Sequence, residues 1–222
     1  MQTHLLDKQS TRNALRKQRR SLSQEQQQEA ASNLAALAQT LPLFLNAKQV
    51  AFYLPHDGEI NPLPLLELAL KQGKNCYLPK IHPANKPYLL FAPYFSEQSL
   101  LKNRYGILES TISWTQAKMP HELDVVFTPL VAFDNKGNRL GMGKGYYDYS
   151  FAFLRTHHYS KQQVQAFGLT RFKRHTQFQK LNAPPPKLIG LAHHFQQVEN
   201  IPTTQWDVPL NMIVTDFATH IL

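Results

Sequence analysis

The strongest constraint on the fold of this chain is a strand–helix–strand pattern in its first half. Residues 50–54 form a short apolar run typical of a buried strand, residues 63–72 have helical periodicity and end at Gly73, and residues 75–79 indicate the next strand. Two strands that are joined by a helix of this length lie parallel in one sheet. The pattern therefore predicts an α/β domain with a mostly parallel central sheet.

Further apolar segments extend this sheet, and a helical region precedes it. Residues 11–41 are rich in Ala, Leu, Gln, Glu and Arg and lack internal Pro or Gly, which predicts helix. Ser23 followed by Gln26 marks a second helical start after a break at Ser21-Leu22. A helix is also expected at residues 147–157, and strands are expected at residues 89–92, 124–129, 188–192 and 212–215. Together these elements predict a three-layer α/β sandwich with an N-terminal helical segment.

Length and composition set the broader limits. The 222 residues are enough for one real core, and we expect a single domain over residues 1–222 with a flexible, basic, proline-ended insertion at residues 158–186. One cysteine excludes an internal disulfide framework, and no apolar run approaches the roughly 20 residues that span a bilayer. Because residues 1–10 also lack the features of a secretion signal, we expect a cytoplasmic protein without a membrane partner. We further expect a monomer.

Three glycines occupy alternate positions shortly after the strand expected at residues 124–129: Gly141, Gly143 and Gly145. A backbone without side chains can present successive N–H groups to an anion, and the carboxyl end of a strand is where ligands bind in open α/β sheets. The spacing matches neither the Walker pattern nor the dinucleotide fingerprint, and a tight turn is the simplest alternative. The position of the glycines nevertheless predicts a phosphate site.

Charged residues flank these glycines as a nucleotide site requires. Arg139 and Lys144 can neutralise a triphosphate, and Asp148 can hold the Mg2+ that accompanies it. Asp148 could also cap the helix that is expected to begin there, and the two roles are compatible. The residues of this run therefore favour ATP with Mg2+ as the ligand.

The stretch from Thr128 to Asp148 resembles the signature of the 5-formyltetrahydrofolate cyclo-ligase family, also called 5,10-methenyltetrahydrofolate synthetase. Further segments resemble, in the family's order, its amino-terminal basic motif, folate-side motif, central motif, last strand and closing segment: residues 12–16, 52–60, 103–109, 188–192 and 206–210. The resemblance thus covers most of the chain. Tyr149 departs from it, since many members have arginine there.

The resemblance implies ATP-dependent cyclisation of 5-formyltetrahydrofolate to 5,10-methenyltetrahydrofolate with release of ADP and phosphate, through a phosphorylated formyl group that N10 attacks. Lys144 and Arg139 would be the catalytic cations. The implied ATP contacts are Arg12, Asn13, Ala14, Leu15, Arg16, Arg139, Leu140, Gly141, Met142, Gly143, Lys144, Gly145, Tyr146 and Tyr147. The implied folate contacts are Leu54, Glu59, Met142, Gly143, Lys144, Gly145 and Tyr146, and the implied magnesium ligands are Asp148 and Asp207.

Each assignment has a structural alternative. Glu59 could be a solvated turn carboxylate, Arg12 and Arg16 a solvated basic stripe on one helical face, and Asp207 a turn residue before Pro209. For the whole chain, the formal net charge of +9 makes nucleic-acid binding an alternative, although no nucleic-acid-binding motif accompanies the charge and we expect no such partner. A second alternative function is that of a nucleotide-binding regulator, which would keep the glycine loop but lack a folate pocket.

Overall fold

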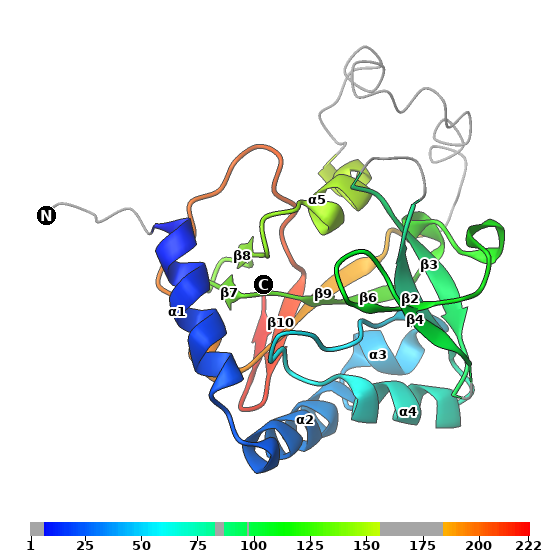
Figure 1. Cartoon of the computed structure of the whole chain (residues 1–222), viewed down its shortest axis with the longest axis horizontal. Coiled ribbons are helices and arrows are strands. Elements are labelled where there is room, and N and C mark those ends of the chain that lie inside the picture. Colours follow the sequence, from blue (N-terminus) through cyan, green and yellow to red (C-terminus); the bar gives the residue numbers. More distant parts are fainter. Residues whose placement is uncertain (1–6, 83–86, 97, 156–183) are drawn as a thin grey trace, which may run out of the picture.

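The computed structural model describes residues 7–82, 87–96, 98–155 and 184–222 (Figure 1). The predicted insertion at residues 158–186 lies outside the described residues except for its last three. The helices are α1 (Lys8–Arg20), α2 (Gln24–Ala38), α3 (Pro42–Asn46), α4 (Leu63–Lys71) and α5 (Tyr146–Ser150). Short 3-10 helices cover Trp114–Gln116, Pro120–Glu122, Ala152–Arg155 and His194–Gln196. The strands are β1 (Gln49–Ala51), β2 (Asn75–Ile81), β3 (Leu89–Tyr94), β4 (Leu100–Lys102), β5 (Leu108–Ser110), β6 (Val125–Pro129), β7 (Ala132–Phe133), β8 (Arg139–Leu140), β9 (Lys187–Ala192), β10 (Met212–Thr215) and β11 (Thr219–Ile221).

The N-terminal helical segment is two helices, as the sequence predicts. The carboxylate of Asp7 accepts hydrogen bonds from the backbone N–H groups of Gln9 and Ser10 and so caps α1. Ser23 and Gln26 form the expected capping box at the start of α2, each side chain accepting from the backbone N–H of the other. The cap at Asp7 begins α1 earlier than composition alone had suggested.

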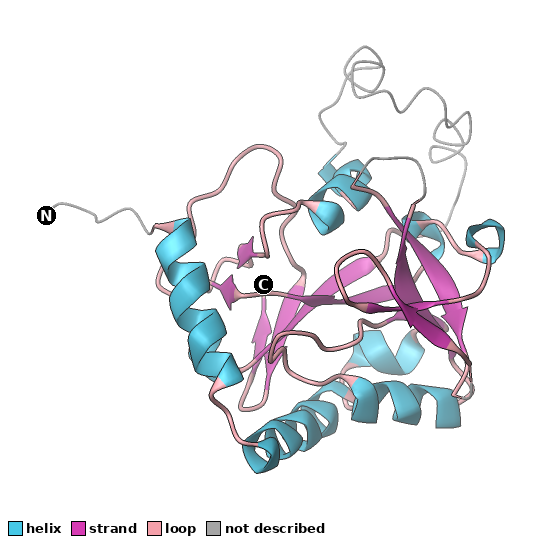
Figure 2. Ribbon diagram, in the orientation of Figure 1, coloured by secondary structure: helices cyan, strands magenta, loops and turns pink. Residues whose placement is uncertain are grey.

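The central sheet, whose strands are magenta in Figure 2, has the strand order β11-β10-β9-β6-β1-β2-β3. The five strands from β10 to β2 are parallel to one another, whereas β11 and β3 pair antiparallel at the two edges. The prediction of an α/β fold with a mostly parallel sheet is therefore confirmed. The predicted strand–helix–strand unit is also confirmed, because β1 and β2 are parallel neighbours joined by α4.

Alternate residues of the central strands bury their side chains on opposite faces of the sheet. In β6, Val125 and Phe127 pack with the face covered by α2, α3 and α4, while Val126 packs with the other face. That second face is covered by Phe133 and Phe151 together with apolar residues of the C-terminal segment. The result is three layers, in which the second covering layer consists largely of short helices and irregular segments.

Two predicted elements are clearly shorter in the structure. As far as residue 155, where the described residues stop, the helix expected at residues 147–157 is only α5 followed by a 3-10 turn. The Ser150 hydroxyl donates to the Tyr146 carbonyl and accepts from the Leu89 N–H, which ties it to β3. The strand expected at residues 50–54 ends at Ala51. The sequence did not indicate the β4–β5 hairpin or the β7–β8 ribbon.

In the part of the chain that the structure describes, no helix is both long enough and apolar enough to cross a lipid bilayer.

Candidate active site

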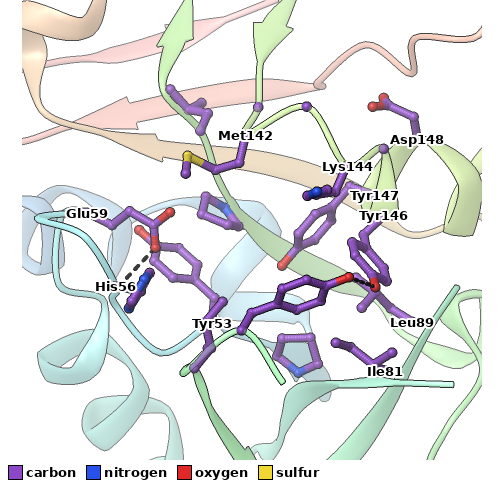
Figure 3. Close-up of a pocket in the computed structure, with 18 of the residues that line it drawn as sticks. Tyr53, His56, Glu59, Ile81, Leu89, Met142, Lys144, Tyr146, Tyr147 and Asp148 are labelled. Atoms are coloured by element: carbon purple, nitrogen blue, oxygen red, sulfur yellow. Dashed lines mark hydrogen bonds between the residues drawn. The ribbon is translucent and has the colours of Figure 1, made fainter. Parts of the chain in front are cut away.

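A cavity of about 540 Å3 opens at the carboxyl ends of the parallel strands. Its floor is formed by Leu78, Pro79 and Ile81 of β2 and by Pro129 and Leu130 at the end of β6, and its walls come from three directions. One wall is the glycine loop between β8 and α5, the second is the segment from Tyr53 to Glu59 after β1, and the third is the β4–β5 hairpin. Figure 3 shows the first two walls on opposite sides of the cavity, with Glu59 and His56 facing Tyr146, Tyr147 and Lys144.

The glycine loop starts from a rigid base. Asp134 is fully buried, and its carboxylate accepts hydrogen bonds from the backbone N–H groups of Lys136, Asn138 and Ile201. These bonds shape the turn between β7 and β8, from which the loop emerges. Gly143 and Gly145 have φ values of 87° and 67°, a region that side chains with a Cβ rarely adopt. The sequence requirement for glycine at these two positions is therefore conformational.

Arg139 and Asp148, on either side of the glycine loop, form a partly buried ion pair. The Arg139 Nη2 to Asp148 Oδ1 distance is 2.6 Å, and the Arg139 side chain is 5% exposed. Arg139 also donates to the Val208 carbonyl, while the Val208 N–H donates to Asp148. Burial lowers the pKa of Arg139, and the charge of Asp148 opposes that effect. This pair joins the glycine loop to the C-terminal segment that carries Asp207.

Lys144 is exposed at the turn of the glycine loop and points toward the cavity (Figure 3). Such a cation can reach a phosphate chain that enters the cavity. On the hairpin side, the hydroxyl groups of Tyr105 and Tyr146 lie 3.0 Å apart, and Arg104 donates to the Tyr146 hydroxyl at 3.0 Å. Tyr146 therefore links α5 to the β4–β5 hairpin across the rim of the cavity.

Glu59 lies in the opposite wall and is largely withdrawn from water, with a side chain that is 12% exposed. Burial raises the pKa of Glu59 to about 7, against the stabilising charge of Arg19 and the hydrogen bond from the His56 N–H at 3.1 Å. Burial and the charge of Glu59 also raise the pKa of Tyr53 and of Tyr147. A carboxylate in this position can accept hydrogen bonds from a flat heterocycle that displaces the remaining water.

The predicted magnesium ligands line the same cavity. Asp148 already pairs with Arg139, and Asp207 Oδ2 accepts hydrogen bonds from the N–H and the hydroxyl of Thr204. Among the described residues, no group of three or more His, Cys, Asp or Glu side chains could hold a metal ion by itself. Two carboxylates nevertheless fit Mg2+, which commonly takes one or two carboxylates and completes its shell with water and substrate phosphates.

The structure brings together most, but not all, of the residues that the sequence assigns to the site. The cavity is lined by Arg12, Leu54, Glu59, Asp148, Asp207 and every residue from Arg139 to Tyr147. The other residues of the predicted basic motif lie elsewhere: Asn13 and Ala14 are exposed, Leu15 packs under the β7–β8 ribbon, and the Arg16 Nε binds Asp57 at 2.7 Å. Arg12 instead donates to the Gly141 carbonyl at 2.8 Å.

Sequence reasoning missed several lining residues. Lys8 lies one helical turn before Arg12, and the hairpin contributes Asn103, Tyr105 and Glu109 from residues 103–109, where the resemblance to the family's central motif implies no particular contact. The four-residue spacing from Lys8 to Arg12, which places both on one helical face, could have revealed Lys8 as a lining residue. The hairpin residues depend on how the hairpin folds back so that β5 contacts β2, which local patterns do not show.

Comparison with known proteins agrees with this architecture. The sequence profile of the 5-formyltetrahydrofolate cyclo-ligase family matches residues 5–173 and 165–216. The 5-formyltetrahydrofolate cyclo-ligase of Haemophilus influenzae is 38% identical over 203 residues, covering 91% of this chain and 94% of its own length. That of Escherichia coli K12 is 37% identical over 201 residues, covering 90% and 96%.

Solved structures agree as well. The NMR structure of Aquifex aeolicus 5,10-methenyltetrahydrofolate synthetase superimposes with a TM-score of 0.70 at 27% identity, covering 96% of this chain and 92% of that one. The synthetase of Mycoplasma pneumoniae, at 22% identity and a TM-score of 0.64, shares the fold.

Proposed function

Since this chain belongs to the 5-formyltetrahydrofolate cyclo-ligase family, we propose that it converts 5-formyltetrahydrofolate to 5,10-methenyltetrahydrofolate and that it uses ATP to do so. The observation that carries the proposal is that one cavity is lined both by a glycine loop with cations and by a buried carboxylate on the facing wall. A phosphate chain suits the first wall and a pterin suits the second.

The proposed chemistry needs activation of a poor leaving group. The formyl oxygen on N5 accepts the γ-phosphoryl group of ATP, and ADP leaves. N10 then attacks the formyl carbon, the ring closes with loss of the N10 proton, and the C–O bond breaks to release phosphate. Phosphoryl transfer of this kind depends on positioning and on neutralising charge.

The residues of this chain would divide that work between the walls. Lys144 would neutralise the transferring phosphoryl group. Arg139, while paired with Asp148, would be the second cation that neutralises phosphate charge. Mg2+ held by Asp148 and Asp207 would supply further positive charge to the phosphates. ATP would be held by Arg12 and residues 139–147, and the folate by Leu54, Glu59 and residues 142–146.

The proposal is tested by following the methenyl product, which absorbs in the near ultraviolet whereas 5-formyltetrahydrofolate does not. Purified protein with ATP, Mg2+ and 5-formyltetrahydrofolate is expected to produce this absorbance together with one ADP per product. Omitting ATP, or replacing it with an analogue that cannot transfer its γ-phosphoryl group, should abolish the signal. Product formation without nucleotide would contradict the ATP-dependent mechanism, and no product under any condition would contradict the proposed activity.

A further inference from the structure

Three arginines of α1 converge on one carboxylate in the wall that carries Glu59. Arg16 Nε and Arg19 Nη2 lie 2.7 and 2.9 Å from Asp57 Oδ2, and Arg20 Nε lies 2.6 Å from Asp57 Oδ1. Burial raises the pKa of Asp57, but the hydrogen bonds from Arg16 and Arg19 outweigh it and hold that pKa below its usual value. Asp57 is therefore an anion around which the end of α1 is fixed.

Arg19 is the centre of this cluster. Its side chain is fully buried, which costs solvation unless every donor group finds a partner. Besides the Asp57 carboxylate, Arg19 donates to the Asp57 carbonyl at 2.7 Å and to the Leu130 carbonyl at 3.2 Å. One guanidinium thus ties α1 both to the loop after β1 and to the end of β6.

The backbone of the same loop is also held. A Cβ at Gly58, whose φ is 75°, would lie only 2.8 Å from the Arg19 carbonyl oxygen, so the loop meets α1 without space for a side chain. Gln27 of α2 donates to the carbonyls of Arg19 and Gly58, and the His193 ring lies 3.3 Å from the Gly58 carbonyl. Asp57 itself has a φ of 56°, a conformation that this crowded setting maintains.

Glu59 is the acidic residue of this loop that lines the cavity. Its carboxylate lies 3.8 Å from Arg19 Nη2, so the guanidinium that anchors the loop also faces the carboxylate. Resting on the proposed function, we propose that Arg19 and Asp57 are positioning residues that hold Glu59 against the folate half of the cavity. Neither residue lines the cavity, and both act through Glu59.

The test compares affinities for the two substrates measured separately, each in the absence of the other so that no turnover occurs. Asp57→Asn keeps the size and the left-handed backbone preference of Asp57 but removes its charge. We expect the dissociation constant for 5-formyltetrahydrofolate to rise at least tenfold and that for ATP to change less than threefold. Lys17→Gln, which removes a charge from an exposed position of the same helix, is the matched control and should leave both affinities unchanged.

The outcomes separate the proposals. A wild-type protein that binds no 5-formyltetrahydrofolate would contradict the proposed function before any variant is made. A folded Asp57→Asn variant with unchanged folate affinity, or with equal losses for both substrates, would overturn the positioning role. If Asp57→Asn does not fold, Arg19→Lys serves instead, because lysine keeps the positive charge beside Asp57 but cannot make the same fork of bonds. It should weaken folate about threefold and ATP not at all, and an unchanged folate affinity would overturn the proposal.

A second readout needs no substrate. The carboxyl carbon of Glu59 can be followed by NMR in isotopically labelled protein and assigned from the signal that Glu59→Gln lacks. The groups around it are Arg19 and Arg16 from α1, Asp57 and the His56 N–H from its own loop, and Tyr53 and Tyr147. In Arg19→Lys, whose ammonium group cannot make the same fork of bonds, the titration midpoint should move upward. An unmoved midpoint would mean that Arg19 does not hold Glu59.

Discussion

The two facing walls of the cavity are built on opposite principles. In the glycine loop, Met142 is 43% exposed, Lys144 is exposed, and a Cβ at Gly141 or Gly145 would meet nothing within 4 Å. In the loop after β1, Arg19 is fully buried, and the side chains of Asp57 and Glu59 are only 11% and 12% exposed. One wall is open to its ligand, whereas the other is already packed and paired.

This difference separates function from stability. Open residues contribute little to folding, so their loss should affect catalysis alone. Packed charges contribute to both, because removing one partner leaves the other buried without compensation. A variant in the glycine loop should therefore change activity alone, whereas a variant in the loop after β1 should change both activity and stability.

Lys144→Ala should have the largest effect on activity. We expect turnover to fall by about 100-fold or more, the range for loss of one charge-stabilising donor, while the free energy of unfolding hardly changes. Lys136→Ala, in the turn before the glycine loop, is the matched control and should keep full turnover. Turnover like that of the wild type in Lys144→Ala would remove Lys144 from the chemistry, and a large loss of stability would show that this wall is not open.

Glu59→Gln should change stability in a way that depends on pH. The folded-state pKa of Glu59 is about 7 and its ordinary value is 4.5, so between these values the folded protein holds a proton that the unfolded chain releases. The wild type therefore loses stability as pH rises through this window. Relative to it, Glu59→Gln should gain roughly 3 kcal/mol between pH 4.5 and pH 8, measured by urea unfolding.

The same variant also tests the role of Glu59 in binding. Its Michaelis constant for folate should rise while that for ATP barely moves, because glutamine is a weaker acceptor for ring N–H groups. A stability difference that does not depend on pH would show that the carboxylate is not buried as described. Equal changes in both Michaelis constants would assign Glu59 a structural role.

Arg16 could belong functionally to either wall. The family resemblance places it on ATP, whereas in the structure its Nε binds Asp57. If Arg16 also contacts phosphate, Arg16→Ala should weaken ATP binding by roughly 1.5 to 3 kcal/mol, or about 10- to 150-fold, measured by calorimetry. Weaker folate binding with unchanged ATP binding would place Arg16 entirely in the Asp57 cluster.

Shortening the segment between Tyr159 and Pro184 should have the smallest effect. Both walls are formed by residues outside this segment, so methenyl formation should stay within about twofold of the wild type. Circular dichroism would confirm folding of the shortened protein. A folded but inactive product would show that the site extends into this segment and that function is not confined to the two walls.

The sequence predicts elements well where the signal is local. The apolar run at Val125–Pro129 is buried on both faces and becomes the centre of the sheet, and Ser23 with Gln26 correctly divides the N-terminal helices. The prediction was wrong about the length of α5, because Ser150 bonds to β3, a partner that is distant in sequence. Tertiary contacts override helical pattern in this case.

The candidate site follows the same rule. The glycine loop is contiguous in sequence, so the residues from Arg139 to Asp148 could be found together, and they line one cavity. The Arg19–Asp57 contact joins residues 38 positions apart, and nothing near Arg19 distinguishes it from Lys17 or Arg20. Burial distinguishes it, and burial depends on the fold as a whole.

The sheet order has a consequence for the kinetics of folding. β1, β2 and β3 follow one another closely along the chain, whereas β6 must find β9 across a long span, since Val125 pairs with Lys187. Closing such a span costs entropy before any pairing repays it, although doubling its length adds only about 0.6 kcal/mol. We expect pulsed hydrogen exchange to show protection at Val50 and Cys76 before Ile189 and Ile213. The C-terminal strands would then complete a sheet whose first half is already assembled.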